Sequence, residues 1–197
     1  MTRLVVGITG ATGAIYGIRL LEVLRGTHDV ETHLVISRAA RRIIAAETEW
    51  AVEEVEALAT RVYDDRDIGA ALASGSFKTA GMVIAPCGVD TLGALAHSLA
   101  GSLIARAGDV TLKEGRTLVA VVRETPLHLG HLRAMLKLAE MGGVILPPLP
   151  AFYPRPQTVD EIVNHTVGRI LDRFGIPHGL VAEWTGTARP RRQPGPR

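Results

Sequence analysis

Short runs of valine, isoleucine and leucine alternate along this chain with stretches in which apolar residues recur every three or four positions. The runs lie at about 3–8, 31–36, 81–85, 117–123 and 142–146, with a weaker one at 61–63. Runs of this length that are apolar at nearly every position are typical of strands covered on both faces. Their alternation with helical segments predicts a single α/β domain, a Rossmann- or flavodoxin-like parallel sheet with helices on both faces.

Two helical segments have the clearest apolar spacing. The first has apolar residues at i, i+3, i+4 and i+7, which predicts a stripe facing the core: Leu132, Met135, Leu136 and Ala139. In the last helix, Thr158 followed by Glu161 has the pattern of a capping box. One face of that helix carries Val159, Ile162, Val163, Thr166, Ile170 and Phe174. Gly175 and Pro177 are expected to end it.

The composition agrees with one soluble globular domain. Of 197 residues, 47% are hydrophobic and 21% charged, which is close to the average for folded domains. The longest apolar runs are strand-sized, far below the roughly 18 residues of a membrane span, and the chain begins without the long apolar region of a secretory signal. We therefore expect a cytoplasmic protein with no membrane partner. The single cysteine, Cys87, cannot form an internal disulfide or a thiolate zinc cluster.

The basic pI of 9.0 comes from the C-terminal end of the chain. Residues 188–197 hold four arginines and no acidic residue, which leaves 18 basic and 20 acidic residues in positions 1–187. The body of the chain is therefore not basic, and no nucleic-acid partner is expected. Three prolines and a glycine among the last ten residues predict a disordered tail at 188–197 after a folded domain at 1–187.

The residues that follow the predicted strands are candidates for ligand binding, because ligands of open parallel sheets bind beyond the carboxyl ends of the strands. The first strand leads through Gly7-Ile8-Thr9-Gly10-Ala11-Thr12-Gly13-Ala14 into a helix. This segment is either a tight turn or a phosphate-binding helix start, and it matches neither a Walker loop nor the strict Gly-x-Gly-x-x-Gly pattern. The second strand ends at Ser37 with no acidic residue for an NAD ribose, so the hydroxyl favours a phosphate or a flat heteroaromatic ring.

Two further strand ends carry polar residues. Pro86-Cys87-Gly88-Val89-Asp90-Thr91 opens a second helix toward the same crevice. Asp90 is either a ligand contact or an ordinary N-cap, and Cys87 is better explained as a small buried residue than as a nucleophile. Arg123 and Glu124 end an apolar strand, and such charges need either each other or a charged ligand.

The proline-rich stretch 147–156 predicts a stiff loop that presents Phe152 and Tyr153 to a ligand or staples them to the core. His128 and His131 share a helix face, but no cysteine or third histidine completes a ligand set near them. A metal site is therefore not expected.

Taken together, the motifs resemble the UbiX/Pad-type flavin prenyltransferases over nearly the whole chain. The residues that carry the resemblance are Gly7–Ala14, Ile36-Ser37, Ala73-Ser74-Gly75-Ser76-Phe77, Asp109-Val110-Thr111-Leu112-Lys113-Glu114, Arg123-Glu124-Thr125-Pro126, Pro150-Ala151-Phe152-Tyr153 and Gly168-Arg169. The resemblance implies an enzyme that joins a dimethylallyl unit from dimethylallyl phosphate to N5 and C6 of reduced FMN without a metal. It also implies a homo-dodecamer with active sites at subunit interfaces, and a partner decarboxylase that receives the prenylated FMN.

The resemblance also implies roles for individual residues. The FMN-binding residues would be Gly10, Ala11, Thr12, Ser37, Gly88, Val89, Asp90, Thr91 and Arg123. The isoprenoid phosphate would be held by Lys113, Arg123, Tyr153 and Arg169, with Trp184 nearby. Glu124 would manage protons, and Glu47 would complete the site from a neighbouring subunit. Three fixed cations suit a phosphate leaving group in a pocket that excludes water.

Two residues depart from the family pattern, and two other functions stay open. Thr12 and Gly88 stand where the family usually has serine, which removes a hydroxyl at position 88. One alternative is an FMN-binding oxidative decarboxylase of the cysteine type, although its Pro-x-Met-Asn-x-x-Met-Trp segment is missing from this sequence. The other is a non-enzymatic FMN-binding accessory subunit of a decarboxylase.

Overall fold

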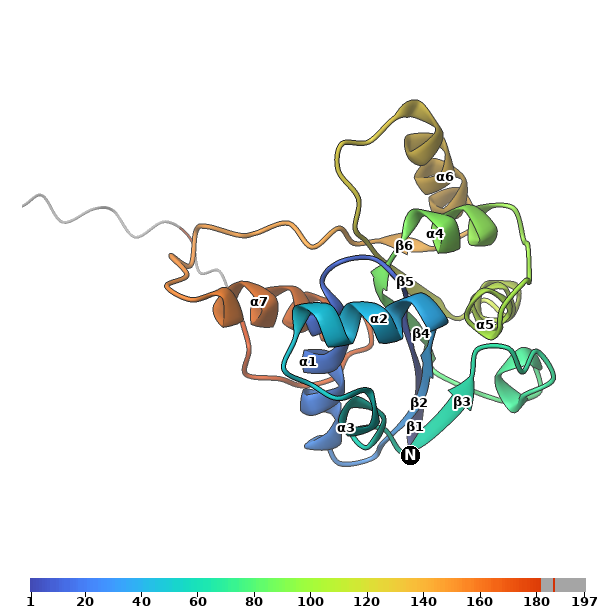
Figure 1. Ribbon diagram of the computed structural model, residues 1–197, viewed down its shortest axis with the longest axis horizontal. Coiled ribbons are helices and arrows are strands. Elements are labelled where there is room, and N and C mark those ends of the chain that lie inside the picture. Colours follow the sequence, from blue (N-terminus) through green and yellow to red (C-terminus); the bar gives the residue numbers. More distant parts are fainter. Residues whose placement is uncertain (182–185, 187–197) are drawn as a thin grey trace, which may run out of the picture.

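The computed structural model describes residues 1–181 and 186, which form a six-stranded parallel sheet with helices on both faces (Figure 1). The strands are β1 (Thr2–Ile8), β2 (Val30–Ile36), β3 (Arg61–Asp64), β4 (Gly81–Cys87), β5 (Thr117–Val122) and β6 (Val144–Ile145). Their order in the sheet is β3-β2-β1-β4-β5-β6, and every neighbouring pair is parallel. The predicted fold class and all six predicted strands are confirmed.

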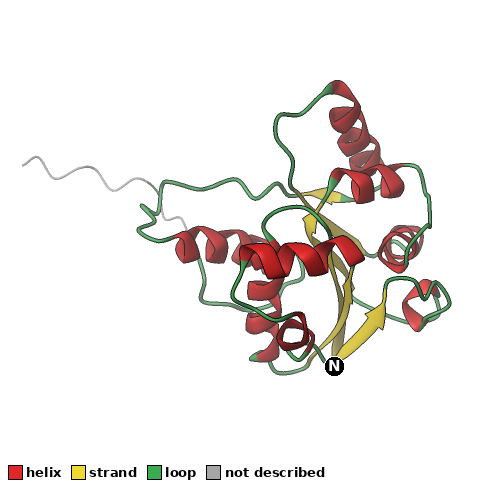
Figure 2. Ribbon diagram, viewed as in Figure 1, coloured by secondary structure: helices red, strands yellow, loops and turns green. Residues whose placement is uncertain are grey.

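Seven α-helices and one short 3-10 helix accompany the described strands (Figure 2). They are α1 (Ala14–Arg25), α2 (Arg38–Glu47), α3 (Val52–Glu56), the 3-10 helix η1 (Ala71–Ala73), α4 (Val89–Ala96), α5 (Leu103–Lys113), α6 (Leu129–Glu140) and α7 (Val159–Asp172). Among these helices, none combines the length and the apolar character that crossing a bilayer requires.

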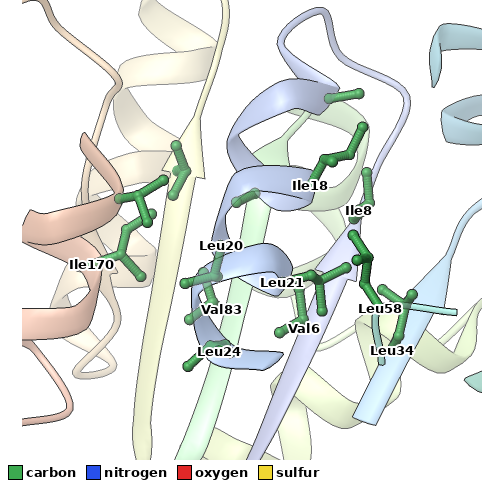
Figure 3. Packing of buried hydrophobic residues seen from close by; sticks show 14 of the residues in the cluster. Val6, Ile8, Ile18, Leu20, Leu21, Leu24, Leu34, Leu58, Val83 and Ile170 are labelled. Carbon is green, nitrogen blue, oxygen red and sulfur yellow. The ribbon is translucent and has the colours of Figure 1, made fainter. Parts of the chain in front are cut away.

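The two faces of the sheet have separate cores because successive strand residues point to opposite faces. On the first face, Val6 and Ile8 of β1 pack with Ile18 and Leu21 of α1 (Figure 3), and α2, α3 and α7 complete that layer. On the second face, Val5 of β1 packs in the cluster that η1, α4, α5 and α6 cover. The strands are therefore buried on both sides, as their continuous apolar runs predicted.

Helix α1 lies close to the sheet because Gly17 has no side chain. A Cβ atom built at this position would lie 2.3 Å from the carbonyl oxygen of Ala85 in β4. A larger residue would push the helix away from the strand. This close contact sets the direction in which the first helix leaves the glycine-containing turn.

Two details of the predicted helix faces are wrong. In α6 the fully buried side chain is Leu138, whereas Leu132 and Leu136 are 47% and 59% exposed. Apolar spacing shows that a helix has an apolar face, but not that the same chain covers it. In α7 the predicted Val163, Thr166 and Ile170 are buried, but Val159 in the first turn is 75% exposed.

The predicted caps of α7 are largely present. The hydroxyl of Thr158 accepts a hydrogen bond from the amide of Glu161 at 3.2 Å, as in a capping box. The carboxylate of Glu161 accepts from the amide of Gln157 instead of that of Thr158, so only half of the box forms. Gly175, with φ of 62°, follows the end of the helix as predicted.

A buried hydroxyl joins the strand ends at the centre of the sheet. Thr9, only 2% exposed, directly follows β1. Its Oγ1 donates to the carbonyl of Pro86 and accepts from the amide of Gly88, both at 2.8 Å. Because β1 and β4 lie side by side, this hydroxyl fixes the turn after β1 against the turn that starts α4.

Replacement of Thr9 by valine tests this link. Valine keeps nearly the same shape but leaves the amide of Gly88 without its partner, which costs about 1–3 kcal/mol. The carbonyl of Pro86 loses one of two hydrogen bonds, because it still accepts from the backbone amide of residue 9 at 3.2 Å. We expect Thr9→Val to lower the melting temperature clearly and Thr9→Ser, which keeps the hydroxyl, to lower it less. Thermal melts at one protein concentration measure this. Equal stability of the two variants would show that the hydroxyl contributes nothing.

Candidate functional site

A cavity of about 570 Å³ lies at the carboxyl edge of the sheet. Residues that follow five of the strands line it together with the start of α5: Thr9, Gly10, Ala11, Thr12, Ser37, Arg38, Ala39, Asp65, Gly88, Val89, Asp90, Thr91, Ser102, Ile104, Arg123 and Glu124. Cavities of this size are typical of small-molecule sites. All nine residues predicted to bind FMN are among those that line it, and so is Glu124.

The turn after β1 approaches α2 closely because Gly10 has no side chain. A Cβ atom at Gly10 would lie 2.3 Å from the Cβ of Ala39 in α2. The amide of Ser37 also donates to the carbonyl of Ile8 at 3.0 Å. The glycine at position 10 and this hydrogen bond bring the start of α2 beside the turn after β1, so that both line one cavity.

The helices that begin at the cavity are capped differently. Ser37 is the N-cap of α2, and its Oγ accepts from the amide of Ala40 at 3.1 Å. Gly88 is the N-cap of α4 and makes no side-chain cap. Asp90 is therefore not the N-cap that one interpretation of the sequence expected; it lies in the first turn of α4 and is exposed. An uncapped helix start with free amide donors is a favourable place for an anion.

Position 88 has room for a side chain. A Cβ atom there would lie 3.5 Å from Thr9 Oγ1 and 3.6 Å from the Cβ of Ala11, which are ordinary contact distances. The backbone of Gly88 has φ of −72° and ψ of 160°, a conformation open to every residue. Lack of space therefore does not require glycine at position 88, and the missing hydroxyl changes only the hydrogen-bonding groups that this position offers.

Arg123 and Glu124 lie half-buried at the end of β5 and line the cavity. The amide of Arg123 donates to the carbonyl of Cys87 at 3.1 Å, which fixes this turn beside β4. Glu124 Oε1 accepts from the amide of Thr125 at 2.9 Å. No ion pair joins the two side chains, nor does another described residue form one with either of them. Of the two possibilities that the sequence left open, a charged ligand therefore fits better than mutual pairing.

Tyr16 of α1 belongs to the surroundings of this site, although sequence reasoning missed it. A Cβ at Gly13 would lie 3.1 Å from the Tyr16 ring. Burial raises the pKa of the Tyr16 phenol above its usual value, while the positive charge of Arg123 lowers it by a smaller amount. The phenol is therefore neutral beside the Arg123 guanidinium at ordinary pH.

The thiol of Cys87 is a packing group. It is fully buried, and desolvation raises its pKa to about 12. A thiol that stays protonated is a poor nucleophile. The interpretation of Cys87 as a buried residue is confirmed.

Glu47 lies outside the lining of the cavity but supports it from the same chain. Its Oε2 accepts a hydrogen bond of 2.8 Å from the amide of Gly13, the N-cap residue of α1. That Glu47 also completes the site of a neighbouring subunit stays a prediction. In this position the carboxylate satisfies a free amide at the positive end of α1.

Lys113 lies near the amino-terminal ends of the strands, far from the cavity at their carboxyl ends. Helix α5 begins at the cavity, where Ile104 is a lining residue, and ends at Lys113. Its 11 residues span about 16 Å. There the ammonium of Lys113 forms an ion pair with Glu114, which lowers the pKa of that carboxyl. Within one chain, the structure therefore does not bring Lys113 together with Arg123.

Tyr153 and Arg169 form a second group away from the cavity. The loop between β6 and α7 runs outward from the sheet (Figure 1), and Phe152 on it is 73% exposed, so it is no staple on the core. Tyr153 and His165 line a separate cavity of about 390 Å³ between this loop and α7. Arg169 Nη1 contacts Asp172 Oδ2 at 2.7 Å. Trp184 and the tail at 188–197 lie outside the described residues.

His128 caps α6, and its ring stacks on that of His131. His128 is the N-cap of this helix, and its Nδ1 accepts from the amides of Gly130 and His131 at 3.0 and 3.4 Å. The His128 and His131 rings stack with centroids 3.5 Å apart. Within the described residues, no group of three histidine, cysteine, aspartate or glutamate side chains is placed to hold a metal.

Several lining residues were missed because they carry no recognisable motif. Asp65 follows β3, so the rule about residues after strands would have found it. Its Oδ1 accepts from the amide of Ile104 at 3.0 Å and its carbonyl from that of Leu103 at 2.7 Å, which fixes the start of α5. Arg38, Ala39, Ser102 and Ile104 are on helix starts, where only the fold shows that they face the cavity.

Comparisons with known proteins agree with this architecture. The family model described as Flavoprotein matches residues 1–171. The flavin prenyltransferase UbiX of Escherichia coli K12 is 57% identical over 94% of this chain and 100% of its own length. The structure of AnUbiX (PadA1) in complex with FMN and dimethylallyl pyrophosphate is 44% identical, with a TM-score of 0.93 over 95% of this chain and 99% of that one.

A further structure is that of a dodecameric FMN-dependent UbiX-like decarboxylase from Escherichia coli O157:H7. It is 48% identical and has a TM-score of 0.92, covering 94% of this chain and 100% of its own. The match to the family model and the identity over nearly full length together show that this chain belongs to the flavoprotein family and, within it, to the UbiX flavin prenyltransferases.

Proposed function

We propose that this protein is a flavin prenyltransferase that joins the dimethylallyl unit of dimethylallyl phosphate to N5 and C6 of reduced FMN. The observation that carries the proposal is the cavity in which an uncapped helix start, the Ser37 hydroxyl, Arg123 and Glu124 converge. A relative that matches over its whole length is named a flavin prenyltransferase, and one similar structure holds FMN and dimethylallyl pyrophosphate.

The residues of the cavity suit FMN. The turn of Gly10, Ala11 and Thr12, the Ser37 hydroxyl and the start of α4 offer neutral donors for the phosphate, the ribityl chain and the polar edge of the ring. Free amides at the start of α4 are donors that an anionic or carbonyl-bearing ligand would satisfy. Bound reduced FMN supplies the nucleophilic N5 and C6 atoms.

The departing phosphate needs positive charge, and Arg123 supplies it from within the cavity. Lys113, Tyr153 and Arg169 do not line the cavity of their own chain. We propose that they reach the cavities of neighbouring subunits in a homo-dodecamer. The exposed apolar face of α6 and the exposed Phe152 support an assembly that covers them, and a similar protein is dodecameric. The role of Trp184 stays a prediction.

Glu124 is placed to handle protons. Formation of the bond at C6 releases a proton from carbon, and departure of the phosphate is helped by a proton on its oxygen. A half-buried carboxylate in the cavity is suited to accept the first or to deliver the second.

The remaining predictions concern the partner protein, the location of the enzyme in the cell and the two parts of its chain. A partner decarboxylase would receive the prenylated FMN, and the enzyme would act in the cytoplasm. Residues 1–187 would form the flavin prenyltransferase domain, and residues 188–197 would form a tail that is not needed for turnover. These proposals rest on the composition of the chain and on the resemblance to the family.

Incubation of the protein with reduced FMN and dimethylallyl phosphate, followed by mass analysis of the flavin, tests the function. A flavin heavier by one dimethylallyl unit supports a prenyltransferase. Unchanged FMN together with release of CO₂ from a cysteine-ending peptide would instead support the oxidative decarboxylase. Binding of FMN with neither reaction would support the accessory subunit.

Replacement of Glu124 by glutamine keeps the shape of the side chain and removes its ability to take up a proton. We expect FMN binding and melting temperature to stay close to those of the original protein while single-turnover product formation falls by about 100-fold or more, in the range typical of general acid–base groups. Glu140→Gln on exposed α6 is the control. Unchanged turnover in the folded Glu124→Gln protein would contradict a catalytic role.

Replacement of Arg169 by alanine removes one proposed phosphate contact. We expect a loss of about 100- to 1000-fold in rate, as for one fixed donor of a charge-stabilising site, with FMN affinity nearly unchanged. Arg173→Ala, one turn further along at the end of α7, is the matched control. Normal turnover of Arg169→Ala would show that Arg169 serves only its pair with Asp172.

Replacement of Gly88 by serine restores a hydroxyl where the side chain has room. We expect FMN to bind about 2- to 10-fold more tightly, the gain of one hydrogen bond, and the melting temperature to rise slightly because serine is the better N-cap. Titration of the apoprotein with FMN measures the affinity. Gly88→Ala, which adds volume without a hydroxyl, should not show the gain in affinity.

A further inference from the structure

A hydrogen bond links the loop before α7 to the middle of that helix. The hydroxyl of Tyr153 lies 2.9 Å from Nε2 of His165. The two rings meet edge to face, with centroids 5.7 Å apart and planes at 79°. A side chain held by both a hydrogen bond and a ring contact has little freedom to rotate. The position of the Tyr153 hydroxyl on its outward-running loop is therefore set by His165.

His165 also lies next to Arg169, which is likewise proposed to bind the isoprenoid phosphate. His165 and Arg169 are separated by four positions in α7, so they lie one above the other on the same face of the helix. Tyr153, His165 and Arg169 thus form one continuous strip of polar side chains. His165 is its middle member, and neither the sequence motifs nor the resemblance assigned it a role.

The imidazole of His165 is neutral at ordinary pH. Partial burial lowers the pKa of His165 below its usual value, and the positive charge of Arg169 one turn away lowers it further. A neutral imidazole has one nitrogen that donates and one that accepts. The bond to Tyr153 can therefore run in either direction, depending on which ring nitrogen carries the proton.

The chemistry of the substrate selects one direction. A phosphate dianion only accepts hydrogen bonds, so a tyrosine that binds it must donate its own proton to a phosphate oxygen. A hydroxyl that gives its proton to His165 would instead turn lone pairs toward the dianion. The hydroxyl of Tyr153 is a phosphate donor only when Nε2 of His165 carries a proton and donates to the phenol oxygen.

We propose that His165 is a positioning residue, which in its Nε2-protonated form donates to the Tyr153 oxygen and so directs the Tyr153 proton to the isoprenoid phosphate. The proposal rests on the function proposed above. His165 does not touch the substrate and acts through Tyr153. Because the phosphate is anionic before and during the reaction, the contact strengthens substrate binding more than it speeds the chemical step.

Steady-state kinetics of four variants test the proposal: His165→Phe, His165→Gln, Tyr153→Phe and the double variant Tyr153→Phe/His165→Phe. Phenylalanine keeps the edge-to-face contact and removes the hydrogen bond, whereas the side-chain amide of glutamine can still donate. For His165→Phe we expect KM for dimethylallyl phosphate to rise about 3- to 10-fold, the usual effect of one hydrogen bond, with little change in kcat or FMN affinity. His165→Gln should stay within about twofold of the original KM, an effect below that of one typical hydrogen bond.

The double variant separates positioning from a general structural effect. If His165 acts only through Tyr153, loss of its hydrogen bond adds nothing once the Tyr153 hydroxyl is gone, so the double variant should match Tyr153→Phe. An additive effect of the two substitutions would overturn the proposal. So would an unchanged KM in His165→Phe, or equal damage from glutamine and phenylalanine.

Two further controls make every outcome decisive. Melting temperatures show whether His165→Phe folds; should it not fold, His165→Leu replaces it in the same comparison with His165→Gln. If the unmodified protein forms no prenylated flavin, the proposed function fails and this role fails with it. If the unmodified protein is active and the KM values do not separate as described, only the role of His165 is overturned.

Discussion

The site depends on how the turns after β1 and β4 are held together at the centre of the sheet. The chain leaves these two neighbouring strands toward opposite faces, so a crevice opens between them, as in other open parallel sheets. The buried hydroxyl of Thr9 bridges the crevice at its base, from the carbonyl of Pro86 to the amide of Gly88. Because the N-cap Gly88 has no side chain, the start of α4 has no side-chain cap, and the amide donors of its first turn are available to a ligand in the cavity.

The same topology divides the proposed site between chains. A helix between two parallel strands runs antiparallel to them. A residue at the end of α5 therefore lies near the amino-terminal ends of the strands, on the opposite side of the sheet from the cavity at their carboxyl ends. Lys113 is such a residue, and Arg169 and Tyr153 belong to α7 and to the loop before it. Arg123 alone among the proposed phosphate-binding cations lines the cavity in the described part of the chain. An assembly that brings the others to it would make the chemistry depend on oligomerisation.

The sequence predicted the parts of the molecule that follow from local pattern. Continuous apolar runs predicted the strands, and the rule about strand ends predicted Ser37, Gly88, Arg123 and Glu124 as lining residues. It could not predict what covers an apolar face, and so the stripe with Leu132 and Leu136 was wrongly assigned to the core. It also could not show that Glu47 contacts Gly13 of the same chain or that His165 contacts Tyr153, because 34 and 12 positions separate these partners and only the folded chain joins them.

The central claim is that one cavity uses charges from more than one chain, and subunit complementation tests it most directly. Arg123→Ala and Arg169→Ala proteins are each assembled alone and then together by co-expression with two different affinity tags, and prenylated FMN is measured in each purified assembly. If Arg169 serves a neighbour's cavity, random mixing of equal amounts restores about a quarter of the sites in a symmetric oligomer, while each variant alone stays inactive. A purified mixed assembly with no more activity than its two parents would contradict the claim.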